Sequence, residues 1–147
     1  MTVDYPRLAA PPETLDDDPR LAELMSRRLV GITSDTAMRV ALGLLADMGV
    51  RHLPVFAGRR CVGLLFEHDI IRCLVGGASG GADAAGEMCR RVPVLRPTDR
   101  RSTAVDRMAG GGVDAVLVAE GHRLVGLVTA SDVIRSLGTA QMVAPEA

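Results

Sequence analysis

An internal repeat, offset by 63 residues without a gap, is the feature that most limits how this chain can fold. Met25-Ser26-Arg27-Arg28 recurs as Met88-Cys89-Arg90-Arg91. The same offset relates Gly49-Val50 to Gly112-Val113, Val62-Gly63-Leu64 to Val125-Gly126-Leu127, and Asp69 to Asp132. Because each short unit would expose an apolar sheet face that it cannot cover alone, we expect the two copies to pack about a pseudo-two-fold axis, with clefts between them.

Each copy has the pattern of an α/β (α+β) unit, in which helices flank a small sheet. Apolar residues follow one stripe of a helix over residues 38–48. Gly49 is placed to end this helix, and one of residues 34–36 is expected to cap its start. The strands predicted for the first copy cover residues 29–32, 52–56 and 61–66. A second helix follows the last strand.

The repeat defines the expected organisation of the chain. A Pro- and Asp-rich stretch precedes the first copy, and a run of glycines separates the two. The predicted segments are an N-terminal arm over 1–18, repeat 1 over 19–76, a Gly-rich linker over 77–83, repeat 2 over 84–140 and a C-terminal tail over 141–147.

Composition excludes several classes of partner. Aromatic residues make up 2% of the chain, too few for a base-stacking nucleic-acid surface. A net charge of -1 attracts neither DNA nor an anionic membrane. No apolar run reaches the roughly 18 residues that cross a bilayer, and the N-terminus lacks a basic-then-apolar pattern. We therefore expect a cytoplasmic protein with no nucleic-acid or membrane partner.

The cysteines are odd in number and lie in apolar segments. We expect Cys61, Cys73 and Cys89 to be buried, reduced thiols. A metal site would need Cys or His pairs at tight spacing. The nearest candidates, His68 and Cys73, are five residues apart and do not share a helix face, so no metal site is expected.

The stretch from Gly126 to Val133 is an apolar run that enters a helical pattern at a hydroxyl and a carboxylate. The first N–H groups of a helix are unpaired, and its dipole favours anions. Thr129 and Asp132 are three residues apart and can face one cleft, where the carboxylate can accept two hydrogen bonds from a ribose diol. The alternative is that Thr129, Ser131 or Asp132 only caps the helix.

Both copies carry residues that resemble a known family. Gly49-Val50-Arg51-His52-Leu53-Pro54-Val55, a glycine-containing turn, Val62-Gly63-Leu64 and an Asp-led helix look like a CBS (cystathionine beta-synthase) domain. The second copy, which ends in Val125-Gly126-Leu127-Val128-Thr129-Ala130-Ser131-Asp132, is closer still. Together the copies resemble a tandem CBS pair, or Bateman module, in a stand-alone protein. Each motif is short, but two copies in gapless register make the resemblance specific.

The resemblance implies a regulatory module that binds AMP, ADP, ATP or S-adenosylmethionine in the cleft between the repeats, with no required cofactor. In the family pattern an Asp holds the ribose diol, hydroxyls help to hold ribose or phosphate, and apolar parts of the other repeat sandwich the adenine. The ligand-binding residues that this implies are Leu127, Thr129, Ser131, Asp132, Val30, Val50 and Arg51.

The first copy departs from this pattern at the hydroxyl. Phe66 stands where the second copy has Thr129, although Asp69 is present. Because a phenyl ring cannot donate to a phosphate, we expect a weak or empty second cleft formed by Asp69, His52 and His68. A protonated His52 could favour phosphate there, or His52 is an ordinary strand-edge histidine.

Three classes of function follow from these residues. An enzyme is not expected, because no nucleophile with its base and no converging acid–base pair is apparent. Thr129 with Asp132 favours a sensor, whereas Phe66 favours a structural or interaction protein that has lost its ligand. The output would lie in a separate regulated protein or in a homodimer. The helical stripes that could form the homodimer interface, or could only face their own sheets, contain Met38, Leu42, Leu45, Ala104, Val105 and Met108.

Overall fold

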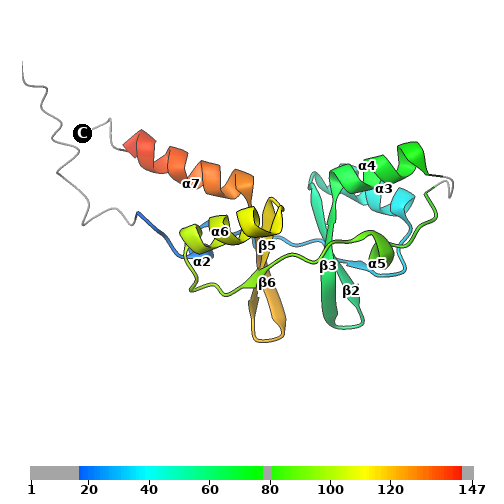
Figure 1. Ribbon diagram of the computed structural model, residues 1–147, viewed down its shortest axis with the longest axis horizontal. Helices are drawn as coiled ribbons and strands as arrows, with labels where there is room; N and C mark the ends of the chain where they lie inside the picture. The colour runs from blue at the N-terminus through cyan, green and yellow to red at the C-terminus, as the bar shows by residue number, and fades with distance from the viewer. Residues whose placement is uncertain (1–16, 78–80, 144–147) are drawn as a thin grey trace, which may run out of the picture. The chain divides into compact units, whose positions relative to one another are not determined.

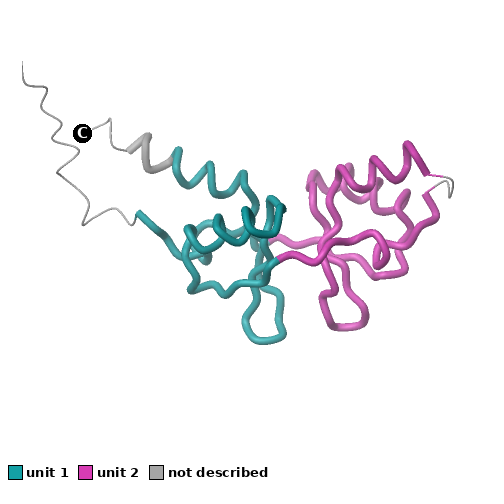
Figure 2. The backbone as a smooth tube through the Cα atoms, viewed as in Figure 1, with its two compact units in different colours: residues 1–27, 93–147 teal, residues 28–92 magenta. Residues whose placement is uncertain are grey.

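The computed structural model describes residues 17–77 and 81–143, with side chains described as far as Gly138. Most of the predicted N-terminal arm, linker residues 78–80 and tail residues 144–147 lie outside the described residues. The described chain forms two compact units (Figure 2). Unit 1 contains the residues up to Arg27 and from Pro93 onward, and unit 2 is Arg28–Val92.

Unit 2 is a three-stranded sheet with flanking helices, as the residue pattern predicts. Its elements are β1 (Ile32–Thr33), α3 (Met38–Met48), β2 (His52–Ala57), β3 (Arg60–Phe66), α4 (Glu67–Gly76) and α5 (Ala85–Met88). Strand β1 pairs in parallel with β2, and β2 pairs antiparallel with β3, with Leu53 opposite Leu65. Helices α3 and α4 lie side by side (Figure 1).

Unit 1 repeats this arrangement. Its elements are α2 (Leu21–Leu24), β4 (Val94–Leu95), α6 (Arg101–Gly111), β5 (Ala115–Glu120), β6 (Arg123–Thr129) and α7 (Ala130–Val143). The strand order is β4-β5-β6, with a parallel first pair and an antiparallel second pair. The prediction of two small sheets with flanking helices is therefore confirmed.

The short first helix of each repeat packs in the unit formed by the rest of the other repeat. Leu21 of α2 is fully buried in the core of unit 1, and the Leu21 amide donates to the Asp99 carbonyl at 2.8 Å. Ala85 of α5 is fully buried in the core of unit 2, and its amide donates to the Thr36 carbonyl at 2.7 Å. The compact units therefore do not coincide with the predicted repeat boundaries, because each sheet takes an apolar cover from a distant part of the chain.

Helix α3 has the predicted stripe, but its start is capped differently. Met38 and Leu45 are buried in the core of unit 2, and Gly49 ends the helix with a left-handed φ of 67°. The cap position is Ala37, which supplies no side-chain acceptor, so the prediction of a cap from residues 34–36 is wrong. The first amides of α3, from Met38 and Arg39, donate instead to backbone carbonyls of the segment before α5.

Two further expectations are corrected. The strand predicted over residues 29–32 is formed by Ile32 and Thr33 alone. Cys61, Cys73 and Cys89 are free thiols, but they are half-buried rather than buried. Burial raises the pKa of the Cys61 and Cys89 thiols, which makes them poor nucleophiles.

None of the helices in the described part of the chain is long and apolar enough to span a membrane.

Candidate functional site

Thr129 and Asp132 form a reciprocal hydrogen-bonded pair at the start of α7. Strand β6 ends at Thr129 and the helix begins at the next residue, so Asp132 is the third residue of its first turn. Asp132 Oδ2 accepts from the Thr129 amide at 2.9 Å and from Thr129 Oγ1 at 3.2 Å, while Thr129 Oγ1 lies 3.3 Å from the Asp132 amide. This is a capping box, the arrangement that the capping alternative describes.

The other carboxylate oxygen of Asp132 faces a largely exposed partner. Asp132 is only 5% exposed, and its Oδ1 accepts from Arg135 Nη1 at 2.9 Å. The Arg135 side chain is 69% exposed and is three residues away on the same helix. A ligand group that donates to Oδ1 could therefore replace Arg135 there, because the largely exposed guanidinium can be solvated by water.

A small pocket in unit 1 opens on this carboxylate. Its volume is about 190 Å³, and its lining residues are Glu23, Leu24, Asp132, Arg135 and Ser136. Ser136 is held in place because its hydroxyl donates to the Val133 carbonyl at 2.6 Å and accepts from Arg101 Nη1 at 3.1 Å. The pocket thus combines the fixed acceptor Asp132 with the exposed carboxylate of Glu23 and the exposed cation of Arg135, groups that can form hydrogen bonds with a polyhydroxyl ligand.

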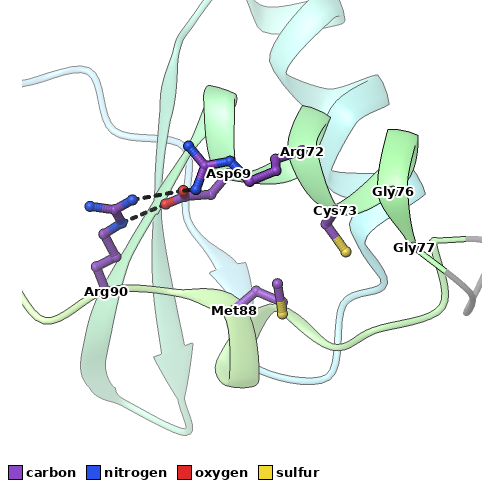
Figure 3. A pocket seen from close by; sticks show the side chains of 7 residues that line it. All are labelled: Asp69, Arg72, Cys73, Gly76, Gly77, Met88 and Arg90. Atoms are coloured by element: carbon purple, nitrogen blue, oxygen red, sulfur yellow. Dashed lines mark hydrogen bonds and ion pairs between the residues drawn. The ribbon is translucent and has the colours of Figure 1, made fainter.

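The equivalent carboxylate in unit 2, Asp69, is bound on both oxygens by one guanidinium. Arg90 Nε donates to Asp69 Oδ2 at 2.6 Å and Arg90 Nη2 donates to Asp69 Oδ1 at 2.8 Å (Figure 3). His68 Nε2 and Arg72 Nη1 lie farther from Oδ1, at 3.6 and 3.7 Å. The hydrogen bonds from Arg90 hold the pKa of Asp69 below its usual range, so the carboxylate is ionised near neutral pH.

Phe66 occupies the cap position of α4 and is enclosed by rings and a cation. Its side chain is 2% exposed. The ring centroids of His52 and His68 are 5.1 and 5.7 Å from that of Phe66, and the guanidinium carbon of Arg90 is 5.5 Å from it. Of the three residues expected in the second cleft, His52 and His68 therefore pack on Phe66, and Asp69 lies next to His68.

A larger cavity of unit 2 adjoins the Asp69–Arg90 pair. Its volume is about 460 Å³. Figure 3 shows Asp69, Arg72 and Cys73 projecting from α4 above Met88 of α5. The remaining lining residues are Gly76, Gly77 and Arg90. Cys73 Sγ also donates to Asp83 Oδ2 at 3.2 Å, and this hydrogen bond raises the pKa of the Cys73 thiol.

The other predicted ligand residues are divided between the units. Leu127 is buried in unit 1, where its amide and carbonyl pair with Ser26, and Ser131 is exposed on α7. Val30 and Val50 pack against the core of unit 2, and Arg51, the residue after Val50, is exposed. That Val30, Val50 and Arg51 contact the same ligand as Asp132 stays a prediction.

Sequence reasoning missed the arginines that pair with the two carboxylates. Arg72 and Arg135 were visible as repeated residues three positions after each Asp. Arg90 was visible only as part of the repeat match with Arg27, and nothing in the pattern links it to Asp69, which lies 21 positions earlier. Within residues 17–77 and 81–143, no cluster of three His, Cys, Asp or Glu side chains is arranged to hold a metal ion.

Comparison with known proteins gives consistent matches. A family model described as CBS domain matches residues 21–76 and 83–139. Uncharacterized protein MJ0188 of Methanocaldococcus jannaschii is 26% identical over 120 residues, which are 80% of this chain and 43% of that protein. The chain therefore spans less than half of that relative's length.

Solved structures resemble the whole described fold. The CBS domain pair of protein MJ0100, in complex with 5′-methylthioadenosine and S-adenosyl-L-methionine, matches with a TM-score of 0.74 and 21% identity, over 84% of this chain and 98% of that one. The CBS-domain containing protein ATU1752 from Agrobacterium tumefaciens matches with a TM-score of 0.72 and 22% identity, over 80% of this chain and 92% of that one. At such identities the likeness concerns the fold.

Proposed function

This chain belongs to the CBS domain family, and we propose that it is a regulatory sensor whose unit 1 binds an adenosyl ligand at the start of α7. The ligand class is AMP, ADP, ATP or S-adenosylmethionine. The observation that carries the proposal is the nearly buried carboxylate of Asp132, which Thr129 orients and which lines a pocket of about 190 Å³. The structural relative MJ0100 was solved with two ligands that both contain an adenosine ribose.

The hydrogen-bonding capacity of Asp132 fits a ribose diol. A carboxylate offers about four acceptor positions. Thr129 uses two of them and Arg135 uses a third. If the exposed Arg135 swings away, two positions are available on the pocket side, one for each vicinal hydroxyl. Arg135 then remains nearby as a cation for a phosphate or carboxylate of the ligand.

The alternative is a structural CBS pair that has lost ligand binding. The capping box favours it, because helix capping by itself accounts for the pairing of Thr129 with Asp132. A sensor should be stabilised by an added adenosyl ligand, whereas a chain with only a capped helix should not, so a binding experiment distinguishes the two.

A thermal-shift panel of AMP, ADP, ATP, S-adenosylmethionine and NAD tests the proposal. A ligand at 100 times its Kd should stabilise the chain by about 2.7 kcal/mol. We expect Asp132→Ala to abolish the ligand-induced shift and Asp69→Ala, its matched control in the other repeat, to change it little. Shifts are compared with and without ligand for each variant, since loss of the capping box also lowers basal stability. No shift with any compound would support the structural alternative.

We also propose that two copies of the chain associate through the outer faces of their helices. Of the stripes expected to supply the interface, Met38, Leu45, Ala104 and Met108 lie in the cores of their own units. Leu42 packs against the core of unit 2, whereas Val105 is 42% exposed. Other apolar residues outside the expected stripes are also exposed. Val75 of α4 is 84% exposed and Ile134 of α7 is 67% exposed, and Ile71 and Leu137 are also exposed. Ile71 and Ile134 hold the same repeat position, which supports a shared interface.

Sedimentation velocity at micromolar concentration tests the homodimer. We expect a dimer for the wild-type chain and a monomer for Ile134→Glu, because a buried charge at the interface would be unpaired. The control is Arg107→Glu, an exposed change on α6 that removes no apolar surface. A wild-type monomer with and without ligand would contradict the proposal.

A further inference from the structure

We infer that Arg90 sets the number of adenosyl ligands that the chain binds, by occupying the Asp69 carboxylate in the place where a ribose diol would bind. The repeat puts Asp69 and Asp132 at equivalent positions, each as the third residue of a helix. This inference rests on the proposed function of unit 1, so its test counts the ligands bound in both units.

The two carboxylates differ in which atoms hold them. Asp132 uses one oxygen to accept from its own capping residue, and the other oxygen faces a single exposed arginine. Asp69 receives a two-point contact from Arg90, with one N–H on each oxygen at 2.6 and 2.8 Å. A planar guanidinium that engages both oxygens of a carboxylate is among the strongest pairings that proteins form. Neutral ribose hydroxyls donate weaker hydrogen bonds to a carboxylate than this guanidinium does.

Arg90 is also held at two further points in unit 2, its backbone and the face of an aromatic ring. The Arg90 amide donates to the Leu64 carbonyl at 2.9 Å, and the Arg90 carbonyl accepts from the Leu64 amide at 2.8 Å. Its guanidinium lies over the Phe66 ring, and its side chain is 39% exposed against 69% for Arg135. A backbone anchored to β3 and a side chain packed on an aromatic ring keep the donors aimed at Asp69.

Space for a ligand exists beside Asp69. The adjoining cavity of about 460 Å³ is larger than the pocket at Asp132, and Asp69 and Arg90 both line it. Phe66 does not line this cavity, because its ring is buried among His52, His68 and Arg90. The difference from Asp132 therefore lies in the donors: on Asp69 both oxygens are held by a charged donor, whereas on Asp132 only Oδ1 is. In the wild-type chain a ribose diol at Asp69 would have to displace the two-point contact from Arg90.

Isothermal titration of the full chain with AMP, and separately with S-adenosylmethionine, measures the number of sites per chain. We expect one site for the wild type and two for Arg90→Gln, which removes the charge and the two-point contact but keeps a polar stem. The double variant Arg90→Gln with Asp69→Ala should return to one site. Arg91→Gln, the exposed neighbouring residue, is the matched control and should keep one site.

Each outcome has a defined meaning. Two sites in the wild type, one site in Arg90→Gln, or two sites in the double variant would overturn the role of Arg90. No site in any protein would overturn both this role and the proposed function. No site in the wild type but one in Arg90→Gln would contradict the proposed site in unit 1 and support the role of Arg90.

A second variant and a second readout keep the test independent of folding defects. Arg90→Met retains the apolar stem that packs on Phe66, and it should also gain a site. Carboxyl ¹³C NMR reports on Asp69 directly: its titration should move to higher pH in both variants, since the hydrogen bonds from Arg90 are lost. An unchanged Asp69 titration would show that Arg90 does not hold this carboxylate in solution.

Discussion

Asp69 and Asp132 show how one repeated residue acquires two different environments. Each is nearly buried at the start of a helix. Thr129 supplies a hydroxyl that orients Asp132, whereas the side chain of Phe66 has no polar atom to offer Asp69. A buried carboxylate needs hydrogen-bond donors, and Asp69 finds them in Arg90. The difference at one cap position thus changes which partner each carboxylate takes.

The Asp69–Arg90 pair should make stability depend on pH in the acid range. Hydrogen bonds from Arg90 lower the pKa of Asp69 below its unfolded value of 3.8. The stabilisation is therefore fully present above the unfolded pKa and is lost as the pH falls through the folded pKa. We expect Asp69→Asn to lower the free energy of unfolding at about pH 6 and to approach the wild type as the solution is acidified below the unfolded value.

Urea unfolding across this pH range measures the difference. Asp47→Asn, on the exposed surface of α3, is the matched control and should show no such convergence. A difference between wild type and Asp69→Asn that grew as the pH fell would contradict the sign of the effect.

At the scale of elements, β3 and β6 each have a glycine near their middle. The missing side chain lets a segment that is distant in the sequence pack closely against the strand. A Cβ on Gly63 would lie 2.8 Å from the Arg90 carbonyl oxygen and 2.8 Å from Cys89 Sγ. A Cβ on Gly126 would lie 2.5 Å from Met25 Sδ. These glycines stand beside the backbone bridges from Leu64 to Arg90 and from Ser26 to Leu127. The close approach explains why both copies of the repeat need glycine there.

Gly63→Ala should therefore destabilise the chain. The obstructing Arg90 oxygen belongs to the backbone and cannot rotate away, so we expect a loss of about 1–3 kcal/mol in the free energy of unfolding. Gly43→Ala is the matched control, because a Cβ at Gly43 in α3 meets nothing within 4 Å. It should stabilise the chain by about 0.5–1 kcal/mol through helix propensity. Denaturant unfolding of both variants checks the opposite signs, and equal effects would contradict the packing account.

At the scale of the whole molecule, α2 and α5 are exchanged between the repeats. Each compact unit therefore combines most of one repeat with the first helix of the other. Unit 2 is one continuous segment, Arg28–Val92, whereas unit 1 needs two segments of the chain. The buried side chain of Ala85 and the pairing of Arg90 with Leu64 both come from beyond the end of repeat 1. Cutting the chain at the repeat boundary would remove them.

Two fragments test this organisation. A fragment of residues 28–92 should unfold cooperatively in urea, because it contains the whole of unit 2. A fragment of residues 19–76 should not, because the core of unit 2 loses the cover that Ala85 and Met88 provide. Circular dichroism during the titration distinguishes them. Cooperative unfolding of the 19–76 fragment alone would contradict the importance of the exchanged helix.

The sequence by itself determined the duplicated α+β units, the strand-to-helix junction at Asp132, and the absence of a hydroxyl partner for Asp69, because Phe66 stands in its place. These features are local: helical and strand periodicities, glycine at a helix end and a fixed repeat offset can all be read within a few residues. It did not determine the cap of α3, the exchanged helices or the pairing of Arg90 with Asp69. Those depend on which distant segment covers each sheet, a choice made by packing and by the need of buried polar groups for partners, so only the tertiary structure decided them.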